Sequence, residues 1–570
     1  MSKRKIGVYI CHCGGNISDY VDVEKVRQAI EKEEDVVVAK TTMFACSDAA
    51  QQEMMDDIKE KGLDAIVIAS CSPKLHLFTF RSMAQRAGLN PYQYVQVNIR
   101  EQDSWAHTDD VEGATEKAIS LVKAGVAKAR ATKPLEPIRV ETKKKALVVG
   151  GGISGLRAAL SLSDMGIYVF LIEKEKELGG WVGNFSSMYP HNRSGREIIK
   201  TLEEEVKKRE RITIFTEAEL IEKSGVLGDF QVKIRTRGEV INLEVGSIII
   251  TTGFEEYRPS EGEFGFGLPG VITLPQFKKM VEEAKGELKF NGKKVNTVAY
   301  IYCVGSRQRE GNTYCSRYCC NATLHSAILA SKISPSIRQF HLYRDIRTYG
   351  KNELLYEDAS KLGSVFLKWS EDQPPQVSPN NGHLRVKVKD LLTEGEEVEI
   401  DTDLVVLVTG MVPRKNEALT EVLKLPTGRD GFYNEIHPKL RPVETVIDGV
   451  YIAGAAQGPK NSYEAVASSL AAASKVATLV LKGFAELEPQ VATVDPEKCE
   501  WCGLCLEACP YNAFEKVSHG GKEVAKVIEA LCKGCGGCVP VCPVDAIDVR
   551  GYEDATIKSM IEELLAGGEE

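Results

Sequence analysis

The chain lacks the features of a secreted, membrane-spanning or nucleic-acid-binding protein. Basic residues follow Met1, but the apolar run behind them, residues 6–10, is shorter than the roughly seven residues that a secretory signal needs. No stretch approaches the ~18 apolar residues of a membrane span. The net charge is −9 and no basic stripe offsets it, which argues against nucleic acid as a partner. We therefore expect a cytoplasmic protein without membrane insertion.

Cysteine, by contrast, is present in an unusual arrangement. The 570 residues include 16 cysteines, too few for a disulfide scaffold at this length. In a reducing compartment, cysteine clusters indicate metal or redox sites. They fall into sets of four, four and eight, and four is the ligand number of iron–sulfur clusters. The first set is Cys11, Cys13, Cys46 and Cys71; the second is Cys303, Cys315, Cys319 and Cys320; the third lies at 499–542.

Two polar, proline-containing linkers, residues 133–145 and 487–498, divide the chain. We expect an α/β multidomain protein in three pieces. They are an N-terminal α/β domain over 1–133, a central nucleotide-binding domain over 145–485, and a cysteine-rich C-terminal domain over 490–570.

The first cysteine set lies next to candidate strands. The apolar, β-branched runs 6–10 and 65–69 lead directly into Cys11 and Cys71, whereas Cys46 stands between candidate helices. Open α/β sheets place ligands at the carboxyl ends of their strands, so these cysteines could converge on a [4Fe–4S] cluster. The alternative is partly buried structural thiols. His12 and His76 are interpreted as neighbours of this set rather than ligands.

The central piece opens with a dinucleotide-binding pattern. A strand at 146–149 leads into Gly150, Gly152 and Gly155, and a helix follows. These glycines permit a tight turn, a close approach of the backbone to a pyrophosphate, and close helix–strand packing. A second strand at 168–172 ends at Glu173, about twenty residues on, where a carboxylate can accept the ribose hydroxyls.

Residues 173–181 resemble the FAD fingerprint of two-dinucleotide-domain flavoproteins, and this resemblance implies a second nucleotide-binding unit at about 260–400, which lacks the glycine pattern. Its first strand, 298–302, is followed by Gly305 as the only glycine of the three, so we expect no nicotinamide binding there. The second cysteine set begins at this place instead. Cluster ligation is the favoured interpretation, and a redox thiol pair or buried thiols are the alternatives.

The C-terminal piece carries the spacing C-x₂-C-x₂-C-x₃-C-P twice. This is the run of bacterial two-cluster ferredoxins, in which the fourth cysteine of each run ligates the other cluster. The predicted ligands are Cys499, Cys502, Cys505 and Cys542 for one [4Fe–4S] cluster, and Cys532, Cys535, Cys538 and Cys509 for the other. A zinc site has no reason to use this crossed repeat.

Residues 173–181 resemble the extended FAD fingerprint of two-dinucleotide-domain flavoproteins such as thioredoxin reductase, with Gly179 and Gly180 as further cofactor contacts. Three later strand ends, at Gly253, Gly410 and Gly454, fit that superfamily. The resemblance implies a thioredoxin-reductase-like FAD core. Ala455 stands where an aspartate usually follows the last glycine, which removes one expected flavin hydrogen bond.

Nearly the whole chain resembles the A subunit of heterodisulfide reductase, most specifically at residues 11–17, 69–73, 302–307, 314–320 and 453–460. The resemblance implies an oxidoreductase subunit in which FAD splits electron pairs (bifurcation or confurcation) between ferredoxin and a disulfide-type acceptor through [4Fe–4S] clusters. It also implies sister subunits, an electron-donor subunit, and a dimer within a larger complex.

Two residues, His325 and Lys460, are candidates for tuning the flavin. Methanogen members carry a lysine where this chain has His325. That departure leaves open whether the flavin is tuned for bifurcation in the same way. Two alternatives therefore stay beside the resemblance: the related flavoprotein of a quinone-interacting membrane-bound oxidoreductase complex, and a non-bifurcating electron-transfer scaffold.

Overall fold

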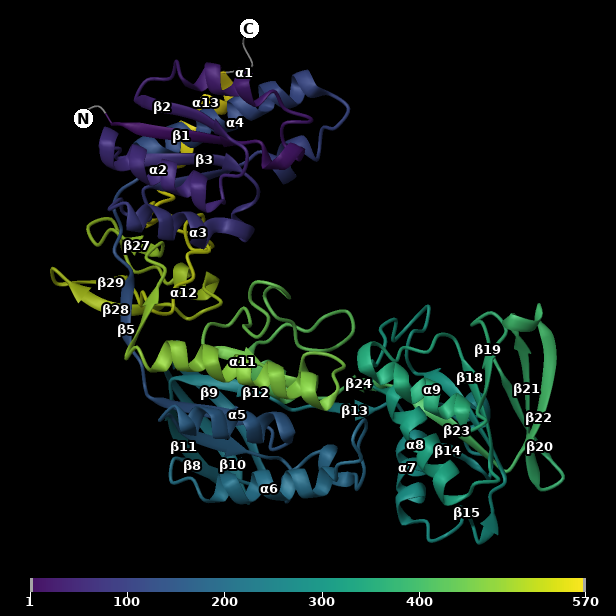
Figure 1. Ribbon diagram of the computed structural model, residues 1–570. Coiled ribbons are helices and arrows are strands. Elements are labelled where there is room, and N and C mark those ends of the chain that lie inside the picture. Colours follow the sequence, from purple (N-terminus) through teal and green to yellow (C-terminus); the bar gives the residue numbers. More distant parts are fainter. Residues whose placement is uncertain (1–3, 567–570) are drawn as a thin grey trace. The chain divides into compact units, whose positions relative to one another are not determined.

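The computed structural model describes residues 4–566, and the chain forms two compact units (Figure 1). Unit 1 contains the chain up to residue 139 and from residue 486 onward, and unit 2 contains residues 140–485. The connecting segments β5 (Ile138–Glu141) and β26 (Phe484–Leu487) pair as a two-stranded sheet. Both segments belong to or adjoin the predicted linkers, so these linkers contain regular structure.

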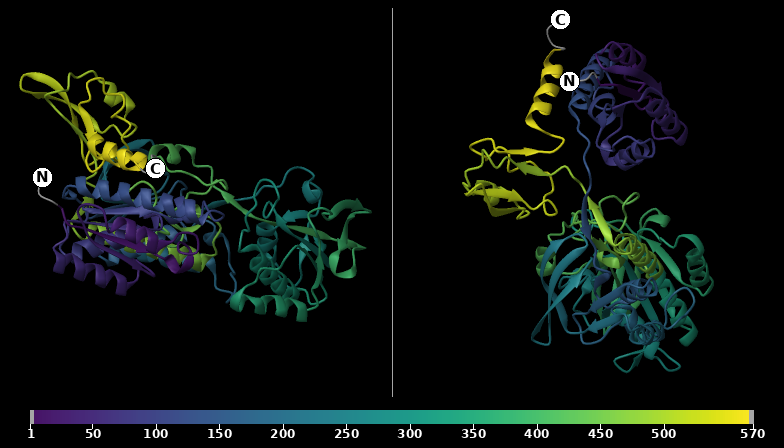
Figure 2. Two further views of the ribbon diagram at one scale, coloured as in Figure 1. Left: turned by 90° about the horizontal axis from the view of Figure 1, so that it is seen from above. Right: turned by 90° about the vertical axis from the view of Figure 1, so that its left-hand side faces the viewer.

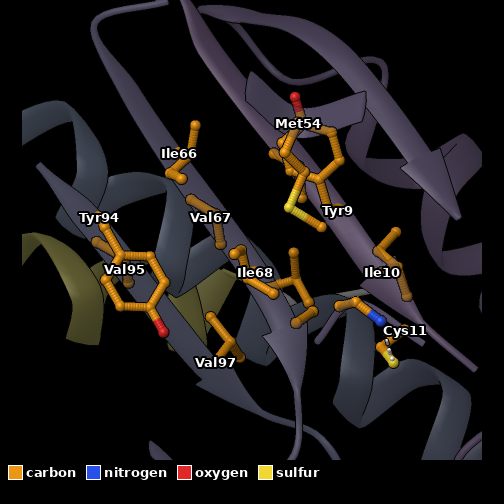
Figure 3. Packing of buried hydrophobic residues seen from close by; sticks show 14 of the residues in the cluster. Tyr9, Ile10, Cys11, Met54, Ile66, Val67, Ile68, Tyr94, Val95 and Val97 are labelled. Carbon is orange, nitrogen blue, oxygen red and sulfur yellow. Dashed lines mark hydrogen bonds between the residues drawn. The ribbon is translucent and has the colours of Figure 1, made fainter. Parts of the chain in front are cut away.

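Unit 1 begins with a four-stranded parallel sheet in the order β2-β1-β3-β4. Its strands are β1 (Ile6–Cys11), β2 (Val36–Thr42), β3 (Ala65–Ser70) and β4 (Tyr94–Asn98). Every residue of β1 and β3 is buried, as expected for central strands covered on both faces. Figure 3 shows this core, in which Tyr9 and Met54 pack beside the β3 side chains.

Four helices cover this sheet: α1 (Val23–Ile30), α2 (Asp48–Lys61), α3 (Pro73–Arg86) and α4 (Val111–Ala131). Helix α1 packs against α4, and α2 packs against α3. The segment before Cys46 is strand β2, so the expectation of helices on both sides of that cysteine is wrong; the β-branched run at 36–38 favours a strand.

The C-terminal part of unit 1 is built from two small antiparallel pairs (Figure 2). Strand β27 (Ala492–Val494) pairs with β30 (Ile547–Val549), and β28 (Phe514–His519) pairs with β29 (Lys522–Val527). Helix α12 (Leu504–Ala508) carries Cys505. The last helix, α13 (Asp554–Ala566), packs on α4, where Lys128 Nζ lies 3.8 Å from the ring centre of Tyr552.

Unit 2 contains a five-stranded parallel sheet in the order β25-β12-β6-β7-β8. Its strands are β6 (Lys145–Val149), β7 (Tyr168–Ile172), β8 (Ile212–Phe215), β12 (Ser247–Ile250) and β25 (Val450–Ile452). Ala146 and Val148 point into a core with α5 (Ile153–Asp164), α6 (Gly195–Lys207) and α11 (Ser462–Val480). Leu147 and Val149 point to the opposite core, formed with an antiparallel sheet of β9 (Ala218–Val226), β10 (Asp229–Thr236) and β11 (Glu239–Val245).

The other half of unit 2 repeats the plan with the parallel order β14-β23-β17-β18-β19. These strands are β14 (Val271–Thr273), β17 (Thr297–Val304), β18 (Arg338–Tyr343), β19 (Val365–Lys368) and β23 (Leu404–Thr409). Helices α7 (Leu274–Glu283), α8 (Cys319–Ile333) and α9 (Glu353–Lys361) accompany them, with an antiparallel sheet of β20 (Gln376–Asn380), β21 (His383–Asp390) and β22 (Glu396–Thr402).

Short elements complete unit 2: β13 (Phe254–Glu256) paired with β24 (Met411–Pro413), β15 (Lys289–Phe290) paired with β16 (Lys293–Lys294), and α10 (Glu417–Leu423). Strand β17 runs further than the sequence predicts and includes Cys303, which has a φ of +64° at a register irregularity. The first member of the second cysteine set therefore stands at a bulge, where the ladder is interrupted.

Candidate cofactor sites

The glycine turn between β6 and α5 has the geometry that the sequence predicts. Gly150 has a φ of +109°, a conformation that favours glycine. A Cβ on Gly155 would lie 1.8 Å from the carbonyl oxygen of Gly150, so only glycine allows α5 to approach the strand. A Cβ on Gly152 would meet nothing within 4 Å. Gly152 therefore borders open space, where a bound phosphate would sit at the amino end of α5.

That space is a cavity of about 680 Å³, within the size range of small-molecule and cofactor sites. Most of the predicted flavin contacts line it, together with one of the two tuning candidates. These residues are Gly150, Gly152, Glu173, Gly179, Gly180, Gly253, Ala455 and Lys460. Glu173 also accepts a 2.6 Å hydrogen bond from the backbone N–H of Gly151, which fixes the carboxylate beside the glycine turn.

Three predicted contacts do not line the cavity. A Cβ on Gly454 would lie 2.3 Å from the Ser154 hydroxyl, and one on Gly410 would lie 2.7 Å from the Ser316 hydroxyl. Like Gly155, they allow close packing behind the site. Gly454 has a φ of +68°, and its N–H donates to the Ser468 hydroxyl at 2.8 Å.

His325 also lies outside the cavity lining. It is buried in α8, and its Nε2 atom lies 2.6 Å from Oδ1 of Asn192. Burial lowers the pKa of His325 to about 4. Lys278 of α7, which no sequence pattern marks, lines the cavity instead.

Three aromatic side chains, Trp181, Phe254 and Tyr318, line one part of the cavity, here called the aromatic end. Trp181 and Phe254 stack with ring centres 5.5 Å apart and an interplanar angle of 13°. Tyr318 lies 6.5 Å from Phe254, also between ring centres, and lines the cavity with Ala322. Large planar aromatic surfaces suit a ring system such as isoalloxazine. The sequence offered only one hint of this group, the Trp after Gly179 and Gly180.

Two members of the second cysteine set adjoin this aromatic end along the chain. Cys319 and Cys320 are buried at the start of α8, between the cavity-lining residues Tyr318 and Ala322. Cys319 interacts electrostatically with the other three members of the set. Burial raises the pKa of the Cys303 thiol to about 11. Reactive redox thiols are exposed, so the burial of Cys319 and Cys320 argues against a redox thiol pair and fits both cluster ligands and buried thiols.

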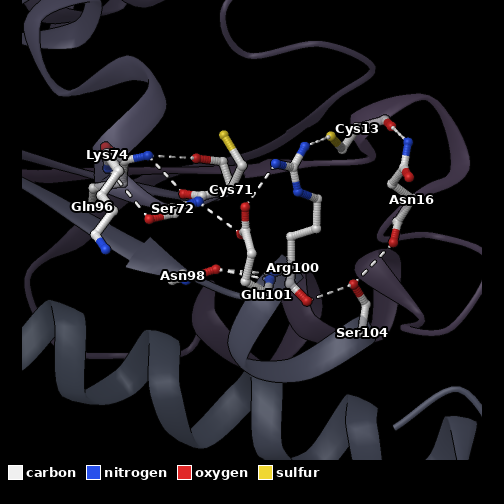
Figure 4. A network of polar contacts seen from close by, with 11 residues as sticks. Cys13, Asn16, Cys71, Ser72, Lys74, Gln96, Asn98, Arg100, Glu101 and Ser104 are labelled. Carbon is white, nitrogen blue, oxygen red and sulfur yellow. Dashed lines mark hydrogen bonds and ion pairs between the residues drawn. The ribbon is translucent and has the colours of Figure 1, made fainter. Parts of the chain in front are cut away.

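The first cysteine set converges at the carboxyl end of the N-terminal parallel sheet. Cys11 accepts hydrogen bonds from the backbone N–H groups of Cys13 and Ala45, each at 3.3 Å. Arg100 donates to Cys13 Sγ at 3.2 Å and pairs with Glu101 at 2.7 Å (Figure 4). Electrostatic interactions connect Cys11 with Cys46 and with Cys71. These donors and the Arg100 charge suit thiolate ligands.

The third set surrounds two separate cavities in the C-terminal part of unit 1. One is lined by Cys499, Cys502, Cys505 and Cys542, and the other by Cys509, Cys532, Cys535 and Cys538. These are the two crossed groups that the repeat predicts. Backbone N–H groups donate to Cys499, Cys509 and Cys542 at 3.3–3.4 Å, a pattern that stabilises thiolate sulfur.

Within residues 4–566, no three or more His, Cys, Asp or Glu side chains are grouped to hold a single metal ion. The eight cysteines at 499–542 instead ring two cavities, as ligands of multi-iron clusters must. In the same range, no helix is both long and apolar enough to cross a bilayer.

Comparisons with known proteins agree with the nucleotide-binding cavity of unit 2 and with the C-terminal cysteine groups. Residues 144–305 match the pyridine nucleotide-disulphide oxidoreductase family, and residues 492–549 match the 4Fe-4S dicluster domain. The A subunit of the H(2):CoB-CoM heterodisulfide,ferredoxin reductase of Methanothermobacter thermautotrophicus is 37 % identical, over 92 % of this chain and 93 % of that protein. The chain belongs to the family of heterodisulfide reductase A subunits.

Other members are similarly related. The iron-sulfur A subunit of the CoB–CoM heterodisulfide reductase of Methanocaldococcus jannaschii is 35 % identical, over 92 % of this chain and 93 % of that protein. Among solved structures, the thioredoxin reductase of T. acidophilum matches 60 % of this chain and 99 % of its own length, with a TM-score of 0.40 and 18 % identity. The family matches confirm the predicted fold class, and they make the chain an oxidoreductase that uses FAD and [4Fe–4S] clusters.

Proposed function

We propose that this chain is the electron-transfer subunit of a heterodisulfide-reductase-like complex that splits electron pairs at FAD between ferredoxin and a disulfide-type acceptor. The observation that carries this proposal is the position of α8. Its first turn lines the aromatic end of the cavity with Tyr318 and Ala322 and holds Cys319 and Cys320 between them. A flavin ring at this end and a cluster on these cysteines would be neighbours.

The cavity residues have distinct tasks in this proposal. The amino end of α5 and the turn at Gly150 and Gly152 bind the pyrophosphate. Glu173 orients the ribose, and Trp181 and Phe254 enclose the flavin ring and exclude water from it. When bound, FAD exchanges electrons both in pairs and singly, which is the chemistry that joins a two-electron donor to one-electron clusters.

Ala455 lines the cavity where the superfamily carries an aspartate, so the flavin contact there is apolar. The cysteine sets then provide the routes away from the flavin. A cluster held by the set at 303–320, which belongs to unit 2 like the cavity, would be the first acceptor of single electrons, and the other sets belong to unit 1. The sulfur-directed N–H groups and Arg100 adjust the cluster potentials.

The partners follow from the names of the relatives. The Methanothermobacter protein and its Methanosarcina acetivorans relative, the A subunit of a Ferredoxin/F(420)H(2)-dependent CoB-CoM heterodisulfide reductase, are both named for ferredoxin and CoB-CoM heterodisulfide. We propose three kinds of partner for this chain, within a complex that contains it twice: ferredoxin, sister reductase subunits and an electron-donor subunit.

Anaerobic purification with iron and FAD analysis tests the cofactor part of the proposal. Four [4Fe–4S] clusters require about sixteen irons per chain, together with one FAD. About eight irons would refute clusters at both the 11–71 and the 303–320 cysteines. Electron splitting is tested on the co-purified complex: ferredoxin reduction should require the disulfide acceptor, and ferredoxin reduction that proceeds unchanged without it would refute splitting.

A further inference from the structure

A buried lysine belongs to the cavity wall although no sequence pattern marks it. Lys278 lies on α7 and only 7 % of the residue is exposed. Its ammonium group donates a hydrogen bond to the carbonyl oxygen of Ser187 and lies 5.2 Å from the ring centre of Phe185. Phe185, Leu274 and Pro275 line the cavity beside it. A lysine buried to this extent is rare unless it is paired.

Its partner is Glu282, one helical turn further along α7. The distance from Lys278 Nζ to Glu282 Oε1 is 3.7 Å, and the carboxylate side chain is only 5 % exposed. The same Oε1 accepts hydrogen bonds from the backbone N–H groups of Ser186 and Ser187 at 3.0 and 3.1 Å. The other oxygen, Oε2, is buried and has no hydrogen-bond partner in the described structure.

The charges around this pair are few. His325 of α8 interacts electrostatically with Lys278 and with Lys332, but burial favours its neutral form. Burial also lowers the pKa of Lys278 itself, and the Glu282 charge opposes that effect. Lys278 therefore provides a buried ammonium at the cavity wall, and Glu282 is the carboxylate recorded within ion-pair distance of it in the described residues.

We infer that Lys278 and Glu282 together set the reduction potential of the flavin. This inference rests on the proposed binding of FAD in the cavity. Two-electron reduction of a flavin with uptake of one proton adds a negative charge to the ring; the electrons come from the donor and the proton from solvent. A buried cation beside the cavity stabilises that charge, because electrostatic interactions are strong where water is excluded. Glu282 limits the stabilisation by pairing with the cation.

The contacts of the pair also suggest a merely structural role, since both side chains hold residues 186–187 in place. The two roles predict different results. Lys278→Gln removes the charge and keeps an N–H donor for Ser187, so the flavin becomes harder to reduce. Glu282→Gln removes the opposing charge and keeps an acceptor for the Ser186 and Ser187 N–H groups, so the flavin becomes easier to reduce. Loss of a structural brace would shift both variants in the same direction.

The experiment is an anaerobic redox titration of the flavin absorbance in the full-length protein, with FAD stoichiometry determined for each sample. We expect at least a tenfold change in the two-electron equilibrium for each variant, about 30 mV, with opposite signs. Lys279→Gln is the matched control: Lys279 is the next residue on α7, its side chain is 69 % exposed, and its partner Glu283 is also exposed. It should leave the potential unchanged.

Shifts of the same sign, or no shift in Glu282→Gln, would overturn the inference even if Lys278→Gln failed to fold. If the unaltered protein held no FAD, the proposed function itself would be refuted. Failure of the inference about Lys278 and Glu282 can therefore be distinguished from failure of the proposed function.

Discussion

Gly152 and Gly155 belong to the same fingerprint but should respond to alanine in opposite ways. In Gly155→Ala the new methyl group would lie 1.8 Å from the Gly150 carbonyl oxygen and 2.9 Å from the Thr251 hydroxyl. The nearest clash is with backbone, so α5 must move away from the strand by more than roughly 1 Å to restore ordinary contact. Overpacking of this kind costs typically about 1–3 kcal/mol, and we expect about 3 kcal/mol here.

In Gly152→Ala the methyl group meets no atom within 4 Å, and the residue has an ordinary φ of −75°. The stability of the FAD-free protein should therefore change little. FAD binding should weaken strongly, because the methyl group occupies the space through which the backbone approaches a pyrophosphate.

The stability assay is urea denaturation of FAD-free protein, followed through the tryptophan fluorescence of unit 2. Hydrogen exchange of peptides from residues 153–164 reports the local stability of α5. FAD affinity is measured separately by flavin fluorescence quenching. We expect Gly155→Ala to increase the unfolded fraction about a hundredfold and Gly152→Ala to spare stability but lose FAD affinity. Equal stability loss in both variants, or full FAD affinity in Gly152→Ala, would refute this account of the cavity.

Three further predictions concern the clusters and acid stability. The double variant Cys509→Ser/Cys538→Ser removes two ligands of one predicted cluster and should lose about four irons. Cys509→Ser/Cys505→Ser removes one ligand from each predicted cluster and should lose about eight irons. Equal losses of iron in the two variants would contradict the crossed ligation. Arg100→Gln should lower the midpoint potential of a cluster at the first cysteine set, because it removes a positive charge 3.2 Å from Cys13 Sγ; an unchanged potential in an EPR-monitored titration would count against this role. Burial lowers the pKa of His325 from about 6.5 to about 4. As the pH drops through this interval, the His325 imidazole of the unfolded chain is protonated before that of the folded chain. The free energy of unfolding should therefore fall, by up to about 3 kcal/mol. His325→Gln should flatten that part of the stability–pH curve, while buried His341 still contributes to the loss; a curve unchanged by the substitution would show that His325 is not responsible.

Local patterns predicted the parts of the protein whose geometry is determined by neighbouring residues. Gly150, Gly152 and Gly155 each meet a requirement of one short turn. The crossed cysteine groups follow from the repeat, because the spacing within each run fixes which three sulfur atoms lie together.

Features that combine distant segments were not predictable in this way. The aromatic end of the cavity joins Trp181, Phe254 and Tyr318 from three separate segments, and Lys278 comes from a helix with no fingerprint of its own. His325 was selected through the resemblance, because it stands five residues after Cys320, where methanogen members carry a lysine. The helix turns it toward Asn192 instead, because residues five positions apart in an α-helix point in different directions.

The pairing of β5 with β26 has a consequence for how the chain accommodates change. Paired strands lie about 4.8 Å apart, so the flavin-containing unit departs from and returns to the rest of the chain at almost one point. Such an insert can be lengthened, shortened or exchanged for another without rethreading the polypeptide around it. The two sequence segments of unit 1 meet where α13 packs on α4. Unit 1 can therefore stay one folded unit in evolution, although its two segments are separated in the sequence by unit 2.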